Sequence, residues 1–434
     1  MKKLLSTTIL SATFAVGMLA AAPAFAEDVL HIPNLSYRTG PFAGTGIPLM
    51  NGQRDYMTML NERDGGVNGV KLSYEECETG YNTEKGVECY EKTKGEGIVT
   101  QPWSTGITLQ VLPKSNVDKR AILAPGYGFS PMADGKTFQW AFNPPSSYWD
   151  GAQMLLSYVS GGNLDSLKGK KIALIHLDHP YGKEPIPLLE ALAAKHGFTF
   201  MAIPVGLKEM QNQSAQWLQI RRENPDFVFM WGWGAMNAGA VNEAVKTKFP
   251  MEKFLGIWWS GHDGDMASAG AAAKGYRAIS WNVPVNDAPV MADIKNYVAD
   301  AGKSDTPADQ AGWVFYQRGI AISMFLVEAV KAAQANFNTK TVDAEQVRWG
   351  LENLKIDEAK LKELGMGGMV VPFQTSCSNH TGHGGAWIIE WDGAKFNKVS
   401  DQLQADRAAI EPLEAAKAKE YADANAPWPM QECK

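Results

Sequence analysis

The sequence predicts an α/β fold built from two doubly wound lobes, and two observations lead to this prediction. Short apolar runs alternate with longer amphipathic segments along most of the chain, which is typical of βαβ units around a mainly parallel sheet. The alternation stops at Asn143-Pro144-Pro145 and then starts again, so the elements form two series. A chain of 434 residues is also too long for one compact core.

The first series has four predicted strands, and a helix follows each of the first three. Apolar side chains at helical spacing, among them Ile47, Met50 and Met57, mark the inner face of the first helix. Gly65-Gly66 then ends this helix before the second strand. The strands are predicted at 29–35, 70–74, 98–100 and 121–124, and the helices at 46–63, 83–94 and 105–117.

The second series alternates four helices with four strands. Its first strand, 171–177, reads KIALIHL, and such an unbroken apolar run is typical of a strand covered on both faces. The other strands are predicted at 198–204, 226–231 and 254–258, and the helices at 148–159, 184–196, 214–223 and 237–247.

The last third of the chain is expected to complete these two lobes. It contains strand-like runs at 276–283, 369–373 and 386–391, and helices at 313–333 and 343–354. We therefore expect three hinge crossings between the lobes, near Asn143, Asn282 and Val371. The predicted division is 27–143 with 283–370 for lobe 1, 144–282 with 371–395 for lobe 2, and 396–434 for a surface tail rich in Ala, Lys, Glu and Pro.

The N-terminus has the pattern of a cleaved secretory signal peptide, residues 1–26. Lys2 and Lys3 precede an apolar stretch at 4–19, and Ala24-Phe25-Ala26 supplies the small-residue cleavage site. The alternative, a membrane anchor, fits less well because the apolar stretch is short and interrupted. The lack of a cysteine near residue 26 argues against a lipid anchor, so we expect a soluble exported protein.

Composition and motifs argue against several classes of function. The net charge of −6 and the lack of a basic block make nucleic acid an unlikely partner. We find no Gly-x-Ser-x-Gly elbow, Walker A loop or His-Glu-x-x-His motif. Ser260, His262 and Asp263 are neighbours, whereas members of a catalytic triad come from different loops. We therefore predict no enzymatic activity, no catalytic residue and no cofactor.

The cysteine count is even, which in an exported chain indicates disulfides. The four cysteines allow three connectivities, and we favour Cys77 with Cys89 and Cys377 with Cys433. The alternative is a zinc site, because His380 and another histidine follow Cys377 closely. Their spacing does not match the usual zinc motifs, so no metal site is predicted.

Loops that follow strands are the candidate binding segments, because open α/β sheets bind ligands at the carboxyl ends of strands and at helix N-termini. In lobe 1 these loops supply Trp103, Ser104 and Thr105, and then Gly126, Tyr127 and Gly128. Ser104 or Thr105 could cap the following helix, and the same exposed N–H groups could hold a ligand carboxylate. The two roles are compatible.

In lobe 2 the strand-end loops are rich in aromatic residues. They supply Tyr181, Trp233 and Trp258, and Asp263 follows the last of them. One such tryptophan would indicate core packing, but aromatic residues on three loops favour a cluster that faces a ligand over packing between loops.

Residues 29 to about 395 resemble the leucine/isoleucine/valine-binding protein family in an ordered set of segments. The segments are Gly40-Pro41, 65–70, 74–77, 103–105, 125–128, 172–176 with Tyr181-Gly182, and 225–228. The resemblance implies the type I periplasmic-binding-protein fold, with two Rossmann-like lobes that close on a ligand. It implies a periplasmic solute-binding protein of a branched-chain amino acid-type ABC importer, a monomer whose partners are a small-molecule solute and the permease and ATPase subunits at the inner membrane.

The resemblance also assigns roles to individual positions. The family grips the substrate carboxylate through a loop that falls on Ser104, and its aromatic contacts match Tyr181 and Trp233. The acidic residue that holds the substrate ammonium is replaced by Trp258, although Asp263 or Asp265 could supply an acid nearby. Cys77 matches a family disulfide, with its partner displaced to Cys89.

Because of the replaced acid, three solute classes stay open. They are a carboxylate-bearing amino acid, an aromatic or small carboxylic acid, and an amide or urea-like molecule. A role as a ligand-presenting component of a sensory system also stays open, since the same closed lobes would be recognised there.

Overall fold

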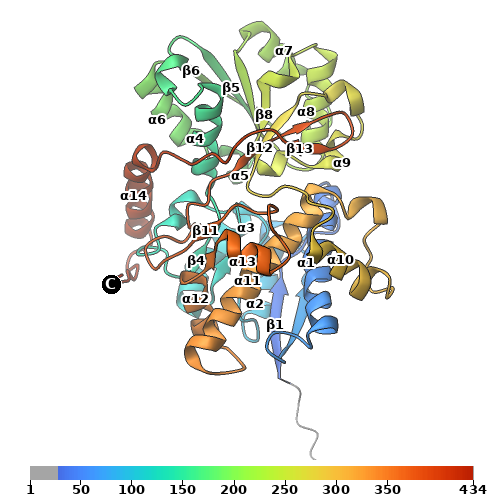
Figure 1. Cartoon of the computed structure of the whole chain (residues 1–434). Coiled ribbons are helices and arrows are strands. Elements are labelled where there is room, and N and C mark those ends of the chain that lie inside the picture. The colour runs from blue at the N-terminus through green and yellow to red at the C-terminus, as the bar shows by residue number, and fades with distance from the viewer. Residues whose placement is uncertain (1–27, 434) are drawn as a thin grey trace, which may run out of the picture.

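The structure, a computed structural model, describes residues 28–433. The predicted signal peptide, residues 1–26, lies outside the described residues. Figure 1 shows two α/β lobes, one above the other, with the last helix, α14 (Arg407–Ala424), beside the boundary between them.

The sheet of lobe 1 is parallel and short. β1 (Val29–Asn34) pairs with β2 (Lys71–Glu76), and β3 (Ile122–Leu123) pairs with β4 (Ala141–Phe142). Single bridges from Asn34 to Gln101 and from Thr100 to Ile122 join the two pairs. The strand predicted at 98–100 is therefore reduced to isolated bridges. Two further short strands, β10 (Lys355–Ile356) and β11 (Phe373–Gln374), pair antiparallel.

Helices cover this sheet and form most of the lobe (Figure 1). They are α1 (Ala43–Arg63), α2 (Thr83–Thr93), α3 (Thr105–Asp118), α10 (Pro289–Ile294), α11 (Val314–Phe337), α12 (Ala344–Glu352) and α13 (Glu358–Glu363).

Two glycines let α1 and α11 pack with their backbones close together. A β-carbon on Gly52 would lie 1.9 Å from the carbonyl oxygen of Tyr316, and one on Gly319 would lie 2.1 Å from that of Leu49. Only glycine fits such an approach. α11 has the length and composition of a membrane span, but 72% of its most apolar stretch is buried in the protein, so it is a core helix.

The sheet of lobe 2 has seven strands in the order β13-β12-β9-β8-β7-β5-β6. The strands β5 to β9 run parallel, whereas β12 runs antiparallel to both β9 and β13. The strands are β5 (Lys171–Leu177), β6 (Thr199–Val205), β7 (Phe227–Trp231), β8 (Phe254–Gly256), β9 (Arg277–Ser280), β12 (Trp387–Trp391) and β13 (Phe396–Lys398). The helices are α4 (Tyr148–Val159), α5 (Pro180–Lys183), α6 (Ile186–His196), α7 (Ser214–Glu223), α8 (Ala235–Lys246) and α9 (Asp263–Met266).

The connections between the lobes lie side by side. Asn282 and Val370 form an antiparallel bridge, so two of the connecting segments run against each other. The third segment lies between β4 and α4, where the Asn143 N–H donates to the carbonyl oxygen of His380 at 3.3 Å. The other limits proposed for the two lobes stay a prediction, but Phe373–Gln374, proposed for lobe 2, pair with β10 of lobe 1, so the crossing proposed near Val371 lies further along the chain.

The end of the chain differs from the predicted surface tail, residues 396–434. Its first residues form β13 at the edge of the lobe 2 sheet, and Arg407 at the start of α14 pairs with Asp150 of lobe 2 at 2.5 Å. Further along α14, Tyr421 packs on Phe129 and Phe138 of lobe 1, with ring centroids 5.9 and 5.2 Å apart. Residues 396–433 therefore connect the two lobes on one side of the molecule. Composition alone predicted a tail because the few apolar side chains that hold α14 are widely spaced.

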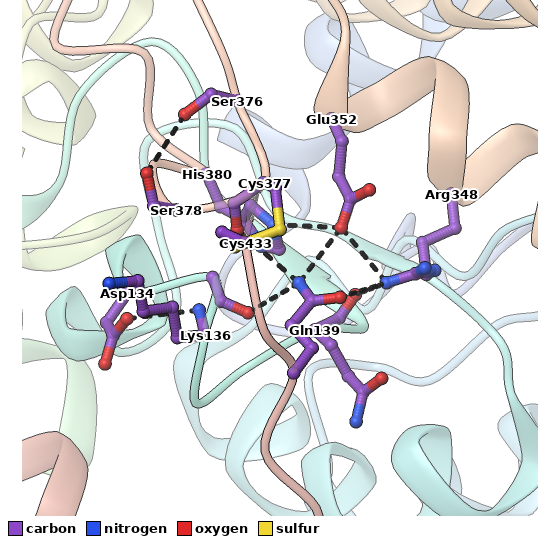
Figure 2. The surroundings of a disulfide bond; sticks show 12 residues. Asp134, Lys136, Gln139, Arg348, Glu352, Ser376, Cys377, Ser378, His380 and Cys433 are labelled. Carbon is purple, nitrogen blue, oxygen red and sulfur yellow. Dashed lines mark hydrogen bonds and ion pairs between the residues drawn. A yellow bond between two sulfur atoms is a disulfide. The ribbon is translucent and has the colours of Figure 1, made fainter.

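Both disulfides have the pairing favoured from the sequence. Cys77 bonds to Cys89, and Cys377 bonds to Cys433. Figure 2 shows the second bond beside Arg348 and Glu352 of α12, which form an ion pair at 3.0 Å. The bond fixes the end of the tail to lobe 1. It also removes Cys377 from the alternative zinc site.

Candidate ligand-binding site

The N-terminus of α3 points its free N–H groups at the boundary between the lobes. Ser104 is the N-cap in an extended conformation, and its hydroxyl accepts a long hydrogen bond from the Ile107 N–H at 3.5 Å. Trp103, just before it, has a φ of +40°, a conformation that is rare outside glycine and costly. Its N–H donates to the Tyr127 hydroxyl at 2.9 Å, and its ring stacks on that of Tyr127 with centroids 5.3 Å apart. The two predicted loops of lobe 1 thus support each other.

A small cavity of about 20 Å³ lies between the lobes, next to this helix start. Eight of its ten lining residues are aromatic and none is charged. They are Tyr37, Tyr81, Trp103, Ser104, Thr105 and Tyr127 from lobe 1, and Tyr148, Tyr181, Trp233 and Trp259 from lobe 2.

Six of the ten predicted binding residues line this cavity. They are Trp103, Ser104, Thr105, Tyr127, Tyr181 and Trp233. Gly126 and Gly128 flank Tyr127 and have φ angles of +69° and +95°, so they shape the loop and do not line the cavity.

Trp258 and Asp263 lie outside the cavity wall. The ring of Trp258 is fully buried and stacks on Tyr148, with centroids 5.8 Å apart. The carboxylate of Asp263 accepts from the Val314 N–H at the start of α11, at 2.8 Å. The neighbouring Trp259 takes the lining position, because the 3-10 turn Trp258–Ser260 directs consecutive side chains to different sides.

Four lining residues were not among the predicted site residues. Tyr37 follows the first strand and Trp259 follows β8, so the strand-end rule would have found both. Tyr148 begins α4 just after the first connection, and Tyr81 lies in the loop between β2 and α2. The strand-end rule therefore covers Tyr81 as well, and no local motif marks Tyr148.

The polar side-chain groups on the cavity wall are neutral hydroxyls and indole N–H groups. Burial raises the pKa of Tyr37, Tyr148 and Tyr181 well above the usual 10, so their hydroxyls stay protonated. Within residues 28–433, the buried Thr105 hydroxyl and Trp233 Nε1 make no well-formed hydrogen bond, and the hydroxyls of Tyr148 and Tyr37 lie beside them. Buried polar groups are normally paired, so these two are suited to contact a solute.

The buried acids of lobe 2 are occupied elsewhere. Asp265 accepts from Asn237 Nδ2 at 2.8 Å, and burial raises its pKa to about 8. Glu184 accepts from the Ser130 N–H at 2.8 Å, and burial likewise raises its pKa to about 8. Neither carboxyl lines the cavity, so neither replaces the acid that the family uses for an ammonium.

This two-lobed arrangement matches a known family over most of the chain. The family model described as periplasmic binding protein matches residues 29–396. The chain belongs to the periplasmic binding protein family.

Comparison with known members extends this family assignment. A structure described as an ABC transporter permease from the Pseudomonas fluorescens group is 37% identical, with a TM-score of 0.86 and coverage of 94% of this chain and 100% of that one. A branched-chain amino acid ABC transporter from Thermus thermophilus with bound valine is 21% identical, with a TM-score of 0.76 and coverage of 89% and 100%. A solute-binding protein from R. palustris in complex with benzoate is 17% identical, with a TM-score of 0.66 and coverage of 88% and 98%. The last two likenesses concern the fold.

A curated relative also matches by sequence. Leu/Ile/Val-binding protein homolog 3 of Brucella melitensis biotype 1 is 24% identical over 240 residues, which is 54% of this chain. The chain spans 61% of the length of that relative.

The structure of this periplasmic binding protein has its lobes in contact at the cavity. The carbonyl oxygen of Gly126 accepts hydrogen bonds from the indole nitrogens of Trp258 and Trp259. The Glu184–Ser130 bond joins the lobes at a second point. In such a protein a solute held between the lobes contacts both at once, so its binding energy can stabilise the closed form.

Proposed function

We propose that this protein is the periplasmic solute-binding component of an ABC importer. It captures a small solute between its lobes as a monomer and delivers it to a membrane permease driven by ATPase subunits. It carries out no reaction and uses no cofactor. Membership of the periplasmic binding protein family and the likeness to solute-binding structures support this role.

The solute is a small, flat carboxylic acid or amide that carries no ammonium group. The observation that carries this choice is the cavity itself, with eight aromatic residues and no charged one. A buried ammonium needs a paired charge or several acceptors, and the wall offers no charged partner. Aromatic faces suit a planar ring, since offset and edge contacts add to the burial of apolar area.

A carboxylate on the solute would bind at the start of α3. Backbone N–H groups at a helix N-terminus stabilise an anion, and the Thr105 hydroxyl is next to them. The ring would then lie between the aromatic side chains of the two lobes. The benzoate complex of the R. palustris relative supports a solute of this kind, whereas the valine complex supports an amino acid.

A thermal-shift screen of the refolded mature protein tests this function. Refolding removes any co-purified solute, and a ligand of the native state raises the melting temperature with its concentration. The panel contains benzoate, phenylacetate, benzamide, leucine, valine, putrescine and urea. We expect shifts with the aromatic acids or amides. A shift with leucine or valine alone would overturn the proposed solute class. A folded protein whose melting temperature no compound of the panel raises would refute that class for every solute tested.

A further inference from the structure

A buried guanidinium lies directly behind the cavity wall. Arg318, in the second turn of α11, is 0% exposed. Its three hydrogen bonds go to neutral acceptors, namely Asn282 Oδ1 at 2.7 Å, the carbonyl oxygen of Trp258 at 2.6 Å and Ser280 Oγ at 3.0 Å.

Arg318 has no carboxylate partner in the described part of the chain. Within residues 28–433, its hydrogen bonds all go to neutral oxygens and no carboxylate forms an ion pair with it. Asp263 is the one carboxylate that acts on it from a longer range, and that carboxylate already accepts the Val314 N–H. Burial lowers the pKa of Arg318 to about 9, so the side chain remains charged at neutral pH.

Aromatic rings surround this charge in place of an acid. Its guanidinium carbon lies 4.9 Å from the ring centre of Trp259, 5.2 Å from that of Trp281 and 4.6 Å from that of Phe315. Rings stabilise a cation through their faces but leave its net charge uncompensated. An unpaired buried charge is costly, so its presence requires a reason beyond stability.

Trp259 connects this charge with the solute position. Its ring lines the cavity and lies 5.3 Å from Trp233 and 6.2 Å from Tyr127, which line the cavity as well. A solute in contact with Trp259 is therefore separated from the guanidinium by little more than one side chain. The intervening material is protein, so water and salt screen the interaction weakly.

We propose that Arg318 determines the charge selectivity of the cavity, favouring an anionic solute over a neutral or cationic one without touching it. This inference rests on the proposed function and specifies it further, from an acid or amide to a carboxylate. Opposite unit charges separated by little more than one ring attract enough, at the effective dielectric constant of a protein, to favour the anion by roughly tenfold or more.

Benzoate and benzamide test this selectivity, because they have almost the same shape and differ in charge. Isothermal titration at pH 7.5 gives the ratio of their affinities. We expect the wild type to bind benzoate at least about tenfold more tightly. Arg318→Gln, which keeps hydrogen-bonding groups without the charge, is expected to bring the ratio close to one. Arg318→Lys, which keeps the charge, is expected to retain most of the preference for benzoate over benzamide.

A second variant tests the same point if Arg318→Gln does not fold. Asp263→Asn removes the one nearby negative charge and leaves the cavity wall intact, so the preference for benzoate should increase. A wild type that binds benzamide as tightly as benzoate would overturn the role of Arg318 and leave the proposed function standing. An unchanged ratio of benzoate to benzamide affinity in folded Arg318→Gln would also overturn the role of Arg318 and leave the proposed function standing. A folded wild type that binds neither probe would refute the proposed solute class and this inference with it.

Discussion

The indole nitrogen of Trp259 donates a hydrogen bond to the carbonyl oxygen of Gly126 at 2.9 Å, and this bond joins lobe 2 to lobe 1 at the cavity wall. The same ring faces the solute position and lies over the Arg318 charge. Contact between the lobes, solute binding and charge selectivity therefore depend on one side chain.

Replacing Trp259 by Phe removes this bond and keeps an aromatic ring. We expect the affinity for the solute identified in the screen to fall about five- to tenfold, the effect of one hydrogen bond of roughly 1 kcal/mol. Trp217→Phe is the matched control, because Trp217 is buried in lobe 2 against Phe249 and Phe254, away from the cavity. Equal affinity loss in both variants would show that the effect is not specific to the cavity.

Gly126→Ala should weaken the closed form of the two lobes. The effect should exceed the backbone strain of placing alanine at a positive φ. The new β-carbon would lie 2.5 Å from Trp281 Nε1 and 3.0 Å from Trp258 Nε1, so rings of the connecting segment and lobe 2 must move. Gly69→Ala is the control, with a similar φ of +83° and no heavy atom within 4 Å. We expect at least about a tenfold loss of affinity, equivalent to 1.4 kcal/mol, in Gly126→Ala alone. Isothermal titration of both variants measures the affinity for the solute. A Gly126→Ala variant that binds the solute as tightly as the wild type would contradict the assigned closure contact.

The Cys377–Cys433 disulfide should stabilise the protein through the C-terminal connection. Its loop spans 56 residues, against 12 for Cys77–Cys89. We expect Cys377→Ser with Cys433→Ser to lower the free energy of unfolding by about 2–4 kcal/mol, and by more than Cys77→Ser with Cys89→Ser does. Urea unfolding of the two double variants makes the comparison. The opposite order would mean that residues 396–433 contribute little to holding the lobes.

Asp265 should make the protein less stable as the pH rises. Burial raises its pKa from 3.8 to about 8, so the folded state holds a proton that the unfolded state has released above about pH 4. Stability from this group is fully present below pH 4 and decreases as the pH rises towards 8. Asp265→Asn should therefore melt as the wild type does at pH 4 and at a higher temperature at pH 8. Asp226→Asn, at a carboxylate whose pKa is lowered, should show no gain at pH 8.

The sequence predicted the alternation of strands and helices well, because buried parallel strands such as 171–177 are unbroken apolar runs. In lobe 1 it named four of the six residues that line the cavity, since Ser104 caps a helix that follows a strand end. It did not name Tyr37, Tyr81 or Tyr148, and Tyr148 reaches the cavity only through the packing of the lobes. It also placed Trp258 where Trp259 lies, because a one-residue difference in a 3-10 turn decides which ring faces inward.

Two features could not be predicted from local patterns. Arg318 is one charged residue within an apolar helix, and its neighbours Asn282, Ser280 and Trp259 come from distant parts of the chain. The contact of α14 with both lobes depends on an ion pair and three aromatic residues spread over residues 129–421. Such long-range contacts are a property of the tertiary fold.

The central claim is that the cavity takes a solute without an ammonium group. Isothermal titration with 3-phenylpropanoate and phenylalanine tests this most directly, because the two molecules differ only in the α-ammonium. We predict that 3-phenylpropanoate binds and that phenylalanine binds at least about a hundredfold more weakly, since its buried ammonium would lack a charged partner. Tighter binding of phenylalanine would contradict the account and would indicate that the solute is an amino acid.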